Sequence, residues 1–281
     1  MKYQYFNFID NDRPNEMIKG KLTKWFVNGE YIKAARLKVR GMDALGIEPI
    51  IEVIAYKLGV LLGLNIAEQR LGVAKFKKTD KEYVSLVSIS PDFVKDSELL
   101  ELKDFAEVYD INENVSIEDL IKNKKIPTEN EKLWSLMIFD YIIMNEDRHN
   151  QNIAWIYSEA DEGSLSPIYD NGYSMLYDAV PKMCEDFKRE AKNCVCNASF
   201  YNDRFSYIET YIQKIKERNN LEDFINLGIS EEQLVYIVEE VKMEYNNIKE
   251  EHKLMNKEVP KEWWTSVVQF LKWRIEYVRK I

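Results

Sequence analysis

The sequence predicts an α+β fold in two lobes, a β-rich N-terminal lobe followed by a helical C-terminal lobe. Up to about residue 89, short β-favouring runs alternate with turn residues. After Pro91, apolar residues recur mostly at helical spacing. Hydrophobic residues make up 46% of the 281 positions, which is enough for a large packed core. We expect the lobes to span residues 1–89 and 90–281.

The strands of the first lobe are marked by their turns. Residues 25–27 and 30–33 flank Asn28-Gly29, a dipeptide typical of a type I′ hairpin because both residues tolerate positive φ. Two further strands are expected at 69–76 and 83–89, joined by the polar turn 78–81.

A helix is expected between the hairpin and these later strands. Pro49 suits the first turn of a helix, and Gly63 suits a stop. Between them, apolar residues recur at helical spacing, at positions 50, 51, 54, 58, 61 and 62.

The second lobe begins with helix signals. Ser116 is expected to start one helix, and Thr128 and Glu131 form a capping box that opens another, reaching Ile142. From about residue 182 the sequence is almost all helical, with further starts at Ser230 and near Pro260.

A loop and a small hairpin interrupt these helices. Residues 145–152 are polar and loop-like. Short strands are expected at 153–157 and 167–169, with a turn over 159–164, so that the second strand ends at Asp170.

Charge and cysteine content narrow the class of protein. The net charge of −9 argues against a general nucleic-acid-binding protein, so we expect no nucleic-acid partner. The three cysteines, Cys184, Cys194 and Cys196, are an odd number and indicate ordinary thiols in a reducing, cytoplasmic compartment. The most apolar stretch, 50–67, carries charged residues and is not expected to span a membrane.

Three polar residues carry the chemical signal. In protein kinases a catalytic Asp is followed five positions later by a metal-binding Asn, and a second Asp follows a hairpin. Asp147, Asn152 and Asp170 have this order and spacing. The alternative is a solvated polar turn between a helix and a strand. The pattern predicts an ATP- and Mg²⁺-dependent phosphotransferase.

The motif Asn-x-Asp147-Arg-His-x-x-Asn152, with Pro-Ile-Tyr-Asp170 downstream, resembles the HipA-type serine/threonine kinases in their shorter, CtkA-related form. The resemblance implies a two-lobed protein-kinase-like fold and transfer of the γ-phosphate of ATP to a protein hydroxyl. It also implies that Asp147 is the catalytic base and that Asn152 and Asp170 bind Mg²⁺. Arg148 and His149 are expected to brace the loop.

A kinase also needs a strand lysine on the phosphates, held by a glutamate of the next helix. Lys33 lies in the second strand of the predicted hairpin, and Glu52 lies near the start of the following helix. Lys38 is the alternative lysine and Glu48 the alternative partner.

Nucleotide contacts are expected at two further places. The turn before the hairpin contains Gly20 and Lys24, which we expect near the phosphates. The adenine is expected against the link between the lobes, near Val87–Ser90, through backbone groups, with Val87 and Ile89 as the named positions.

Two other functions fit the same residues. The string Asp-Arg-His-x-x-Asn also resembles the catalytic loop of phosphoinositide-type lipid kinases. A nucleotide-binding pseudokinase or interaction module would keep the fold without turnover. Replacing Asp147 by Asn should abolish transfer in either kinase and leave a binding function intact.

Overall fold

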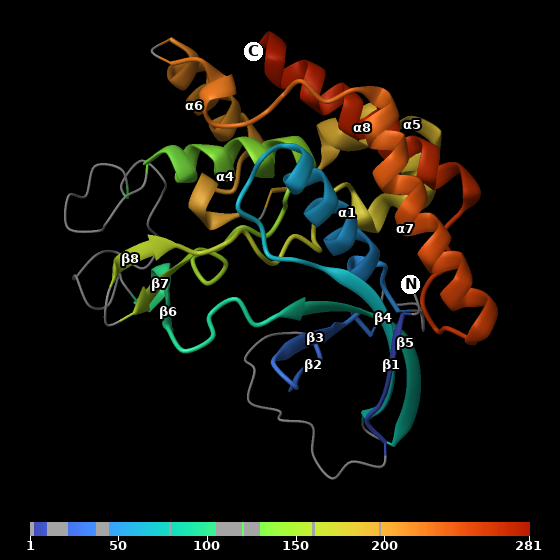
Figure 1. Ribbon diagram of the computed structural model, residues 1–281. Coiled ribbons are helices and arrows are strands. Elements are labelled where there is room, and N and C mark those ends of the chain that lie inside the picture. The colour runs from blue at the N-terminus through green and yellow to red at the C-terminus, as the bar shows by residue number, and fades with distance from the viewer. Residues whose placement is uncertain are drawn as a thin grey trace.

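The computed structural model describes residues 3–9, 22–37, 45–78, 80–104, 120, 130–158, 161–196, 198–217 and 219–281. Figure 1 shows a twisted sheet at one end, most of the helices at the other, and α1 and α7 alongside both. Strands dominate the N-terminal part and helices the C-terminal part. The predicted α+β fold is therefore confirmed.

The large sheet has five strands in the order β1-β4-β5-β3-β2. Its outer strand β1 pairs in parallel with β4, and the other neighbours are antiparallel. The sequence patterns did not predict β1. The strands are β1 (Gln4–Asn7), β2 (Lys24–Val27), β3 (Glu30–Ala34), β4 (Arg70–Lys78) and β5 (Lys81–Pro91).

The predicted hairpin is β2 and β3. Asn28 and Gly29 have φ values of 52° and 76°, the two positive values that a type I′ turn requires. The second predicted pair, β4 and β5, is longer than expected, because pairing continues to Lys78 opposite Lys81.

The helix α1 (Glu48–Leu61) covers one face of the sheet. Pro49 lies in its first turn, where a missing N–H costs no intrahelical bond, and Gly63 follows it with φ 75°. The helix contacts β4 and β5 on one side and α7 on another, which explains why most of its residues are buried.

The remaining helices follow the predicted starts where these are described. Ser230 and Gln233 form a capping box at α7, and Pro260 precedes α8. The expected starts at Ser116 and Thr128 lie outside the described residues. In the described part of the chain, no helix is long and apolar enough to cross a membrane. The helices are α4 (Asn130–Ile143), α5 (Val180–Asn193), α6 (Phe205–Lys216), α7 (Glu231–Glu251) and α8 (Lys261–Lys280).

A small sheet corrects one prediction. It contains β6 (Glu98–Glu101), β7 (Ala154–Ser158) and β8 (Asp161–Leu165), and β7 pairs with β8. The expected second strand at 167–169 is wrong. Ile168 instead exchanges backbone hydrogen bonds with Asn65 and Ala67, just after α1. The chain between β8 and Asp170 therefore runs beside the segment that follows α1.

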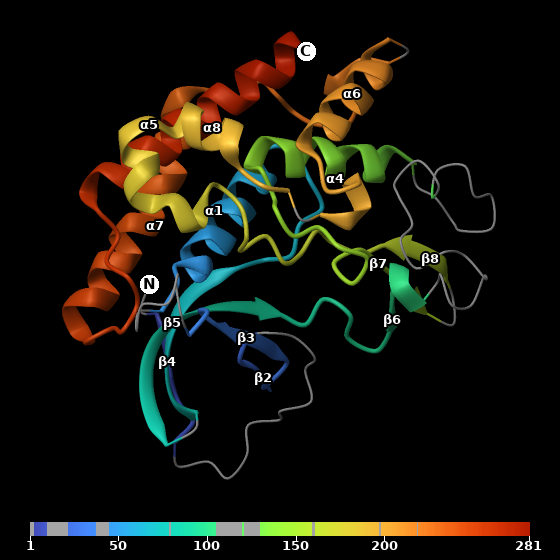
Figure 2. The ribbon, with the colours of Figure 1, turned by 180° about the vertical axis from the view of Figure 1, so that it is seen from behind.

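The link between α7 and α8 connects the helical part to the sheet. Backbone hydrogen bonds join Met255 to Val84 and to Leu45. The side-chain oxygen of Asn256 accepts a hydrogen bond from the backbone amide of Leu86 in β5. Figure 2 shows α7 reaching toward the large sheet, and the Tyr3 hydroxyl, just before β1, donates to Glu251 at the end of that helix. The division into lobes at residue 89 stays a prediction.

Candidate active site

A cavity of about 600 Å³ lies between the large sheet and the loops after α4 and β8. Several residues singled out from sequence line it together, although 137 positions separate Lys33 and Asp170, which are in contact. Those that line it include Lys33, Glu52, Asp147, Asn152 and Asp170. Lys24 lines the same cavity.

The loop after α4 presents Asp147. Met144 turns the chain out of the helix with φ 51°. The side chain of Asn145 accepts from the Asp147 amide at 3.1 Å, and Asn152 donates through Nδ2 to the Asp147 carbonyl at 3.0 Å. The Asp147 side chain is 38% exposed, and His149 Nε2 lies 3.9 Å from its carboxylate. The loop is therefore closed on itself while its carboxylate faces the cavity.

Arg148 is fully buried beneath this loop and joins three segments. Its Nε and one Nη donate to both carboxylate oxygens of Asp140 in α4, at 2.8 and 3.0 Å. The other Nη donates to the carbonyls of Asn152 and Tyr169, at 2.9 and 2.7 Å. The fifth donor reaches Asn171 Oδ1 at 2.8 Å. All five N–H groups are used, so Arg148 has the expected position for bracing the loop.

Asp170 lies at the point where the lobes meet. Its φ of 57° is left-handed, a conformation that aspartate adopts more readily than most residues and that is common at functional sites. The carboxylate accepts a short hydrogen bond from Lys33 and lies 4.0 Å from Lys24. Burial alone would favour the neutral acid, but the two lysines outweigh it and lower the pKa of Asp170 well below its usual value.

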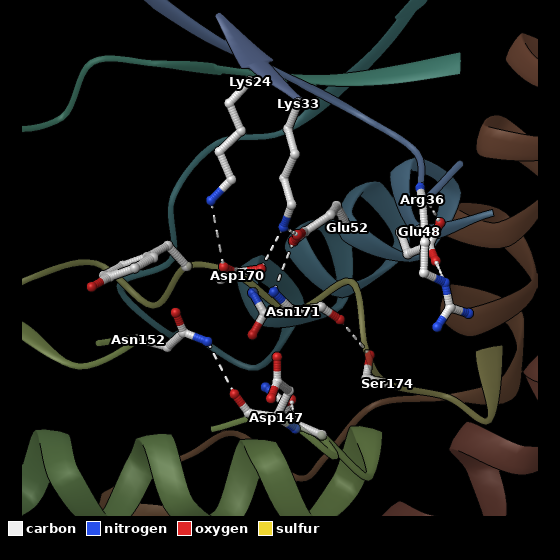
Figure 3. Close-up of polar contacts among 12 residues, drawn as sticks. Lys24, Lys33, Arg36, Glu48, Glu52, Asp147, Asn152, Asp170, Asn171 and Ser174 are labelled. Carbon is white, nitrogen blue, oxygen red and sulfur yellow. Dashed lines mark hydrogen bonds and ion pairs between the residues drawn. The ribbon is translucent and has the colours of Figure 1, made fainter. Parts of the chain in front are cut away.

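Lys33 joins β3 to α1 and to Asp170. Its Nζ donates to Glu52 Oε1 at 2.9 Å, and the other oxygen of Glu52 accepts from the Asn171 amide at 2.9 Å. Figure 3 shows Lys33 reaching both carboxylates from the strand above. Burial opposes the charged lysine, but Asp170 and Glu52 together raise the pKa of Lys33 above its ordinary value. The lysine is therefore held as a cation.

Lys24 is a second cation at the same place. It reaches toward Asp170 from β2, alongside Lys33 (Figure 3). Burial outweighs the attraction of Asp170 and, with the repulsion of Lys33, lowers the pKa of Lys24. Its ammonium group is therefore less well compensated than that of Lys33, and an anion entering the cavity would restore the balance.

One of the expected alternatives lies elsewhere. Glu48, the alternative partner for Lys33, instead lies beside Arg36, with 3.5 Å between Arg36 Nε and Glu48 Oε1. Gly20 and Lys38 lie outside the described residues.

Val87 and Ile89, expected near the adenine, do not line the cavity. Both side chains pack in the small core on the far face of the sheet, and β5 lies between β4 and β3, so their backbone groups face neighbouring strands. Because side chains alternate along a strand, Ser88 and Ser90 line the cavity instead.

The donor set suits Mg²⁺ only together with a ligand. In the part of the chain that the structure describes, no three His, Cys, Asp or Glu side chains form a group that could hold a metal ion. Asn152 and Asp170 both line the cavity and supply one amide and one carboxylate. Mg²⁺ commonly takes one or two protein carboxylates and completes its shell with phosphates and waters. These two residues fit that pattern.

Sequence reasoning missed several members of the site. Asp140 is buried within the apolar run of α4, where a charged residue signals a buried partner. That signal could have pointed to Arg148. The aromatic pair Phe93 and Tyr169, whose ring centroids are 5.8 Å apart in the cavity wall, had no local signal.

Known proteins resemble the chain in sequence family and in fold. The family model of the HipA-like C-terminal domain matches residues 33–247. The crystal structure of CtkA, a proinflammatory kinase of Helicobacter pylori, has a TM-score of 0.62 at 16% identity, covering 99% of this chain and 98% of that one. This match confirms the two-lobed kinase-like fold.

A second solved structure is less similar. It is HipA of Shewanella oneidensis MR-1, in a complex of HipA, HipB and operator DNA. Its TM-score is 0.47 at 14% identity, and the match covers 96% of this chain and 66% of that one. No curated protein sequence matches the chain.

Proposed function

The chain belongs to the family of HipA-like C-terminal domains, and on that premise we propose that it is an ATP- and Mg²⁺-dependent phosphotransferase acting as a serine/threonine-protein kinase. Membership of this family supports a kinase-type phosphotransferase. One observation carries the proposal further. Lys33 contacts both Glu52 and Asp170 within the cavity that Asp147 and Asn152 also line.

The cavity is lined by groups that suit both parts of a nucleotide. Lys24 and Lys33 are cations of the kind that phosphoryl transfer needs on the phosphates. Apolar and aromatic residues in the same lining suit a purine ring, which gains from contact with such side chains. These residues include Leu22, Ile32, Phe93, Val94, Leu99 and Tyr169.

Asn152 and Asp170 are the residues that would hold Mg²⁺ beside those phosphates. When bound, the ion neutralises the charge that develops on the transferred phosphoryl group. Asp170 suits this role because its pKa is lowered, so the carboxylate is charged at neutral pH. Arg148 keeps the two ligands in register, because it donates to the Asn152 carbonyl and to the Tyr169 carbonyl next to Asp170.

Asp147 is the proposed base. It orients an acceptor hydroxyl and takes its proton as the hydroxyl oxygen bonds to the γ-phosphorus and the bond to ADP breaks. Its carboxylate is 38% exposed, so the hydroxyl of a second protein can reach it. The hydrogen bond from Asn152 to the Asp147 carbonyl fixes the distance between base and metal ligand.

Transfer of labelled γ-phosphate in the presence of Mg²⁺ tests the proposal. We expect wild type to label a protein serine or threonine. Asp147→Asn should lower transfer by at least about a hundredfold, because it removes the proton acceptor. Asp170→Ala should do the same by removing a metal ligand. Asp223→Asn, an exposed aspartate of the helical part, is the matched control and should transfer normally.

The same assay separates the alternatives. Phosphoinositide vesicles offered beside protein acceptors would reveal a lipid kinase, which would overturn the choice of acceptor. ATP binding without transfer to either acceptor would favour a pseudokinase. Wild type that neither binds ATP nor transfers phosphate would overturn the proposed function.

A further inference from the structure

A second ion-pair cluster repeats the arrangement around Lys33. Arg36 follows β3, and its amide donates to Glu48 Oε2 at 3.3 Å, while its Nε lies 3.5 Å from the other oxygen of Glu48. Its Nη2 donates to Asp178. Arg36, Glu48 and Asp178 form what we call the Arg36 cluster.

The matching set, Lys33 with Glu52 and Asp170, is the Lys33 cluster. Each cluster joins a cation from β3 or its end, a glutamate from α1 and an aspartate from residues 170–178. The two glutamates are four positions apart, so they share one face of α1. No member of the Arg36 cluster lines the cavity, and Figure 3 shows Arg36 and Glu48 apart from the Lys33 contacts.

The Arg36 cluster also holds the segment that follows Asp170. The guanidinium of Arg36 lies over the rings of Tyr173 and Tyr177, at 5.7 and 5.3 Å from their centroids. The same segment bonds to the loop that carries Asp147, because the Glu146 amide donates to the Tyr173 carbonyl at 2.8 Å. Arg36 therefore connects α1 to a segment that contacts the proposed base's own loop.

We propose that Arg36 is a positioning residue. By joining Glu48 to Asp178, it fixes the start of α1 against residues 173–178 and so keeps Glu52 within reach of Lys33. The inference rests on the proposed function. Side chains of Arg36 and Asp178 are 29% and 31% exposed, so solvent weakens their ion pair. Loss of this ion pair should displace Glu52 and Lys33, and so weaken the proposed phosphate contacts of Lys33 without abolishing them.

The primary variants are Arg36→Gln and Asp178→Asn, which remove one charge each at nearly unchanged size. We expect each to lower kcat about tenfold, because misplaced catalytic groups slow the chemical step. KM for ATP should change less than about twofold, because neither Arg36 nor Asp178 lines the cavity that would hold the nucleotide. The double variant should lose no more than Arg36→Gln alone, since both substitutions remove the same contact between Arg36 and Asp178. Arg36→Lys should recover part of kcat.

A second measurement does not depend on turnover. The Asn171 amide donates to Glu52, so its hydrogen exchange reports whether α1 is in place. We expect faster exchange at Asn171 in Arg36→Gln than in wild type. Arg189→Gln is the matched control, because Arg189 forms surface ion pairs with Glu185 and Glu190. It should leave kcat and exchange unchanged.

The outcomes separate the two proposals. A folded Arg36→Gln protein with wild-type kcat and wild-type exchange at Asn171 overturns the positioning role. A lower unfolding temperature alone, with kcat unchanged, also overturns it and leaves a purely structural contact. Faster exchange in a protein whose wild type transfers no phosphate supports the positioning role while the proposed function fails.

Discussion

The Lys33 cluster and the Arg36 cluster are built alike but differ in charge balance. Beside the Lys33 cluster stands Lys24, so two cations face two carboxylates, and the pKa of Asp170 is lowered. The Arg36 cluster has one cation for two carboxylates. Burial there raises the pKa of Glu48, and Arg36 only partly offsets it.

This difference indicates that the Lys33 cluster is suited to bind a ligand and that the Arg36 cluster is suited to stabilise the fold. Where cations match the carboxylates at the wall of a cavity, incoming phosphates and a metal ion can exchange partners with them. In the Arg36 cluster the single cation is shared between two carboxylates outside the cavity, so its pairs serve to hold chain segments together. Charge balance and access to the cavity thus distinguish two clusters whose residue types are nearly the same.

Removing the central cation of each cluster should give the largest difference between the two clusters. Lys33→Met should lower kcat about a thousandfold, because a fixed cation on the phosphates is lost. Arg36→Met should lower it only about tenfold, since it acts through position. Steady-state kinetics of phosphate transfer measures both. Equal losses in the two variants would contradict the division of roles.

Arg148 is a further cation, fully buried, and its removal should mainly lower the free energy of unfolding. Arg148→Met leaves Asp140 buried without its cation and should cost about 3 kcal/mol in the free energy of unfolding. Urea denaturation measures it. Because an unpaired buried charge causes most of the loss, adding Asp140→Leu should recover part of it. A double variant no more stable than Arg148→Met would contradict this explanation.

Gly172 lies between the two clusters and should affect them together. A Cβ there would lie 3.1 Å from Glu52 Oε1 and 3.2 Å from Glu48 Cβ, tighter than most contacts. Gly172→Ala should therefore push α1 outward, lower kcat and cost about 1 kcal/mol or slightly more in stability. Gly228→Ala is a control with a similar close contact, to Asn226, and should leave kcat unchanged. Wild-type kcat in Gly172→Ala would show that α1 tolerates the shift.

Glu146 should make the stability of the protein depend on pH, and the carboxylates that act on it, Asp147 and Asp178, come from the catalytic loop and from the Arg36 cluster. Burial raises the pKa of Glu146 to about 7, and these two carboxylates add to the rise, against a hydrogen bond from Cys194 that lowers it. The folded protein keeps this proton to about pH 7, whereas the unfolded chain loses it near 4.5. Stability should therefore fall as pH rises through this window.

Glu146→Gln tests that sign directly. The variant carries no ionisable group there, so relative to wild type it should be more stable at pH 8 than at pH 5, by on the order of 1 kcal/mol. Denaturant unfolding at both pH values gives the difference. An identical difference at pH 5 and pH 8 would show that Glu146 ionises normally in the folded protein.

Local signals in the sequence were sufficient for much of the fold. Asn28-Gly29 fixed a hairpin, Pro49 and Gly63 marked the ends of α1, and Ser230 marked the start of α7. Each signal acts through neighbours within a few residues. By contrast, β1 pairs with β4, 68 positions away from Gln4 to Gly72, and a short polar-flanked strand gives no sign of such a partner.

The parts of the candidate site that lie within one short motif or one strand could be located from the sequence. The spacing of Asp147 and Asn152 located a loop that does face the cavity. Within the expected adenine segment, Val87–Ser90, the two serines line the cavity while Val87 and Ile89 pack in the small core, an alternation that the strand pattern itself could have indicated. Arg36 could not be found, since its partner Asp178 lies 142 positions away and only the fold brings them together.

The most direct test of the central claim is a crystal structure of the protein with Mg²⁺ and an ATP analogue that cannot be hydrolysed. We predict that Mg²⁺ is bound by Asn152 and Asp170, that Lys33 contacts the phosphates, and that the γ-phosphate faces Asp147. An analogue bound outside this cavity, or with its phosphates turned away from Lys33 and Asp170, would contradict the account.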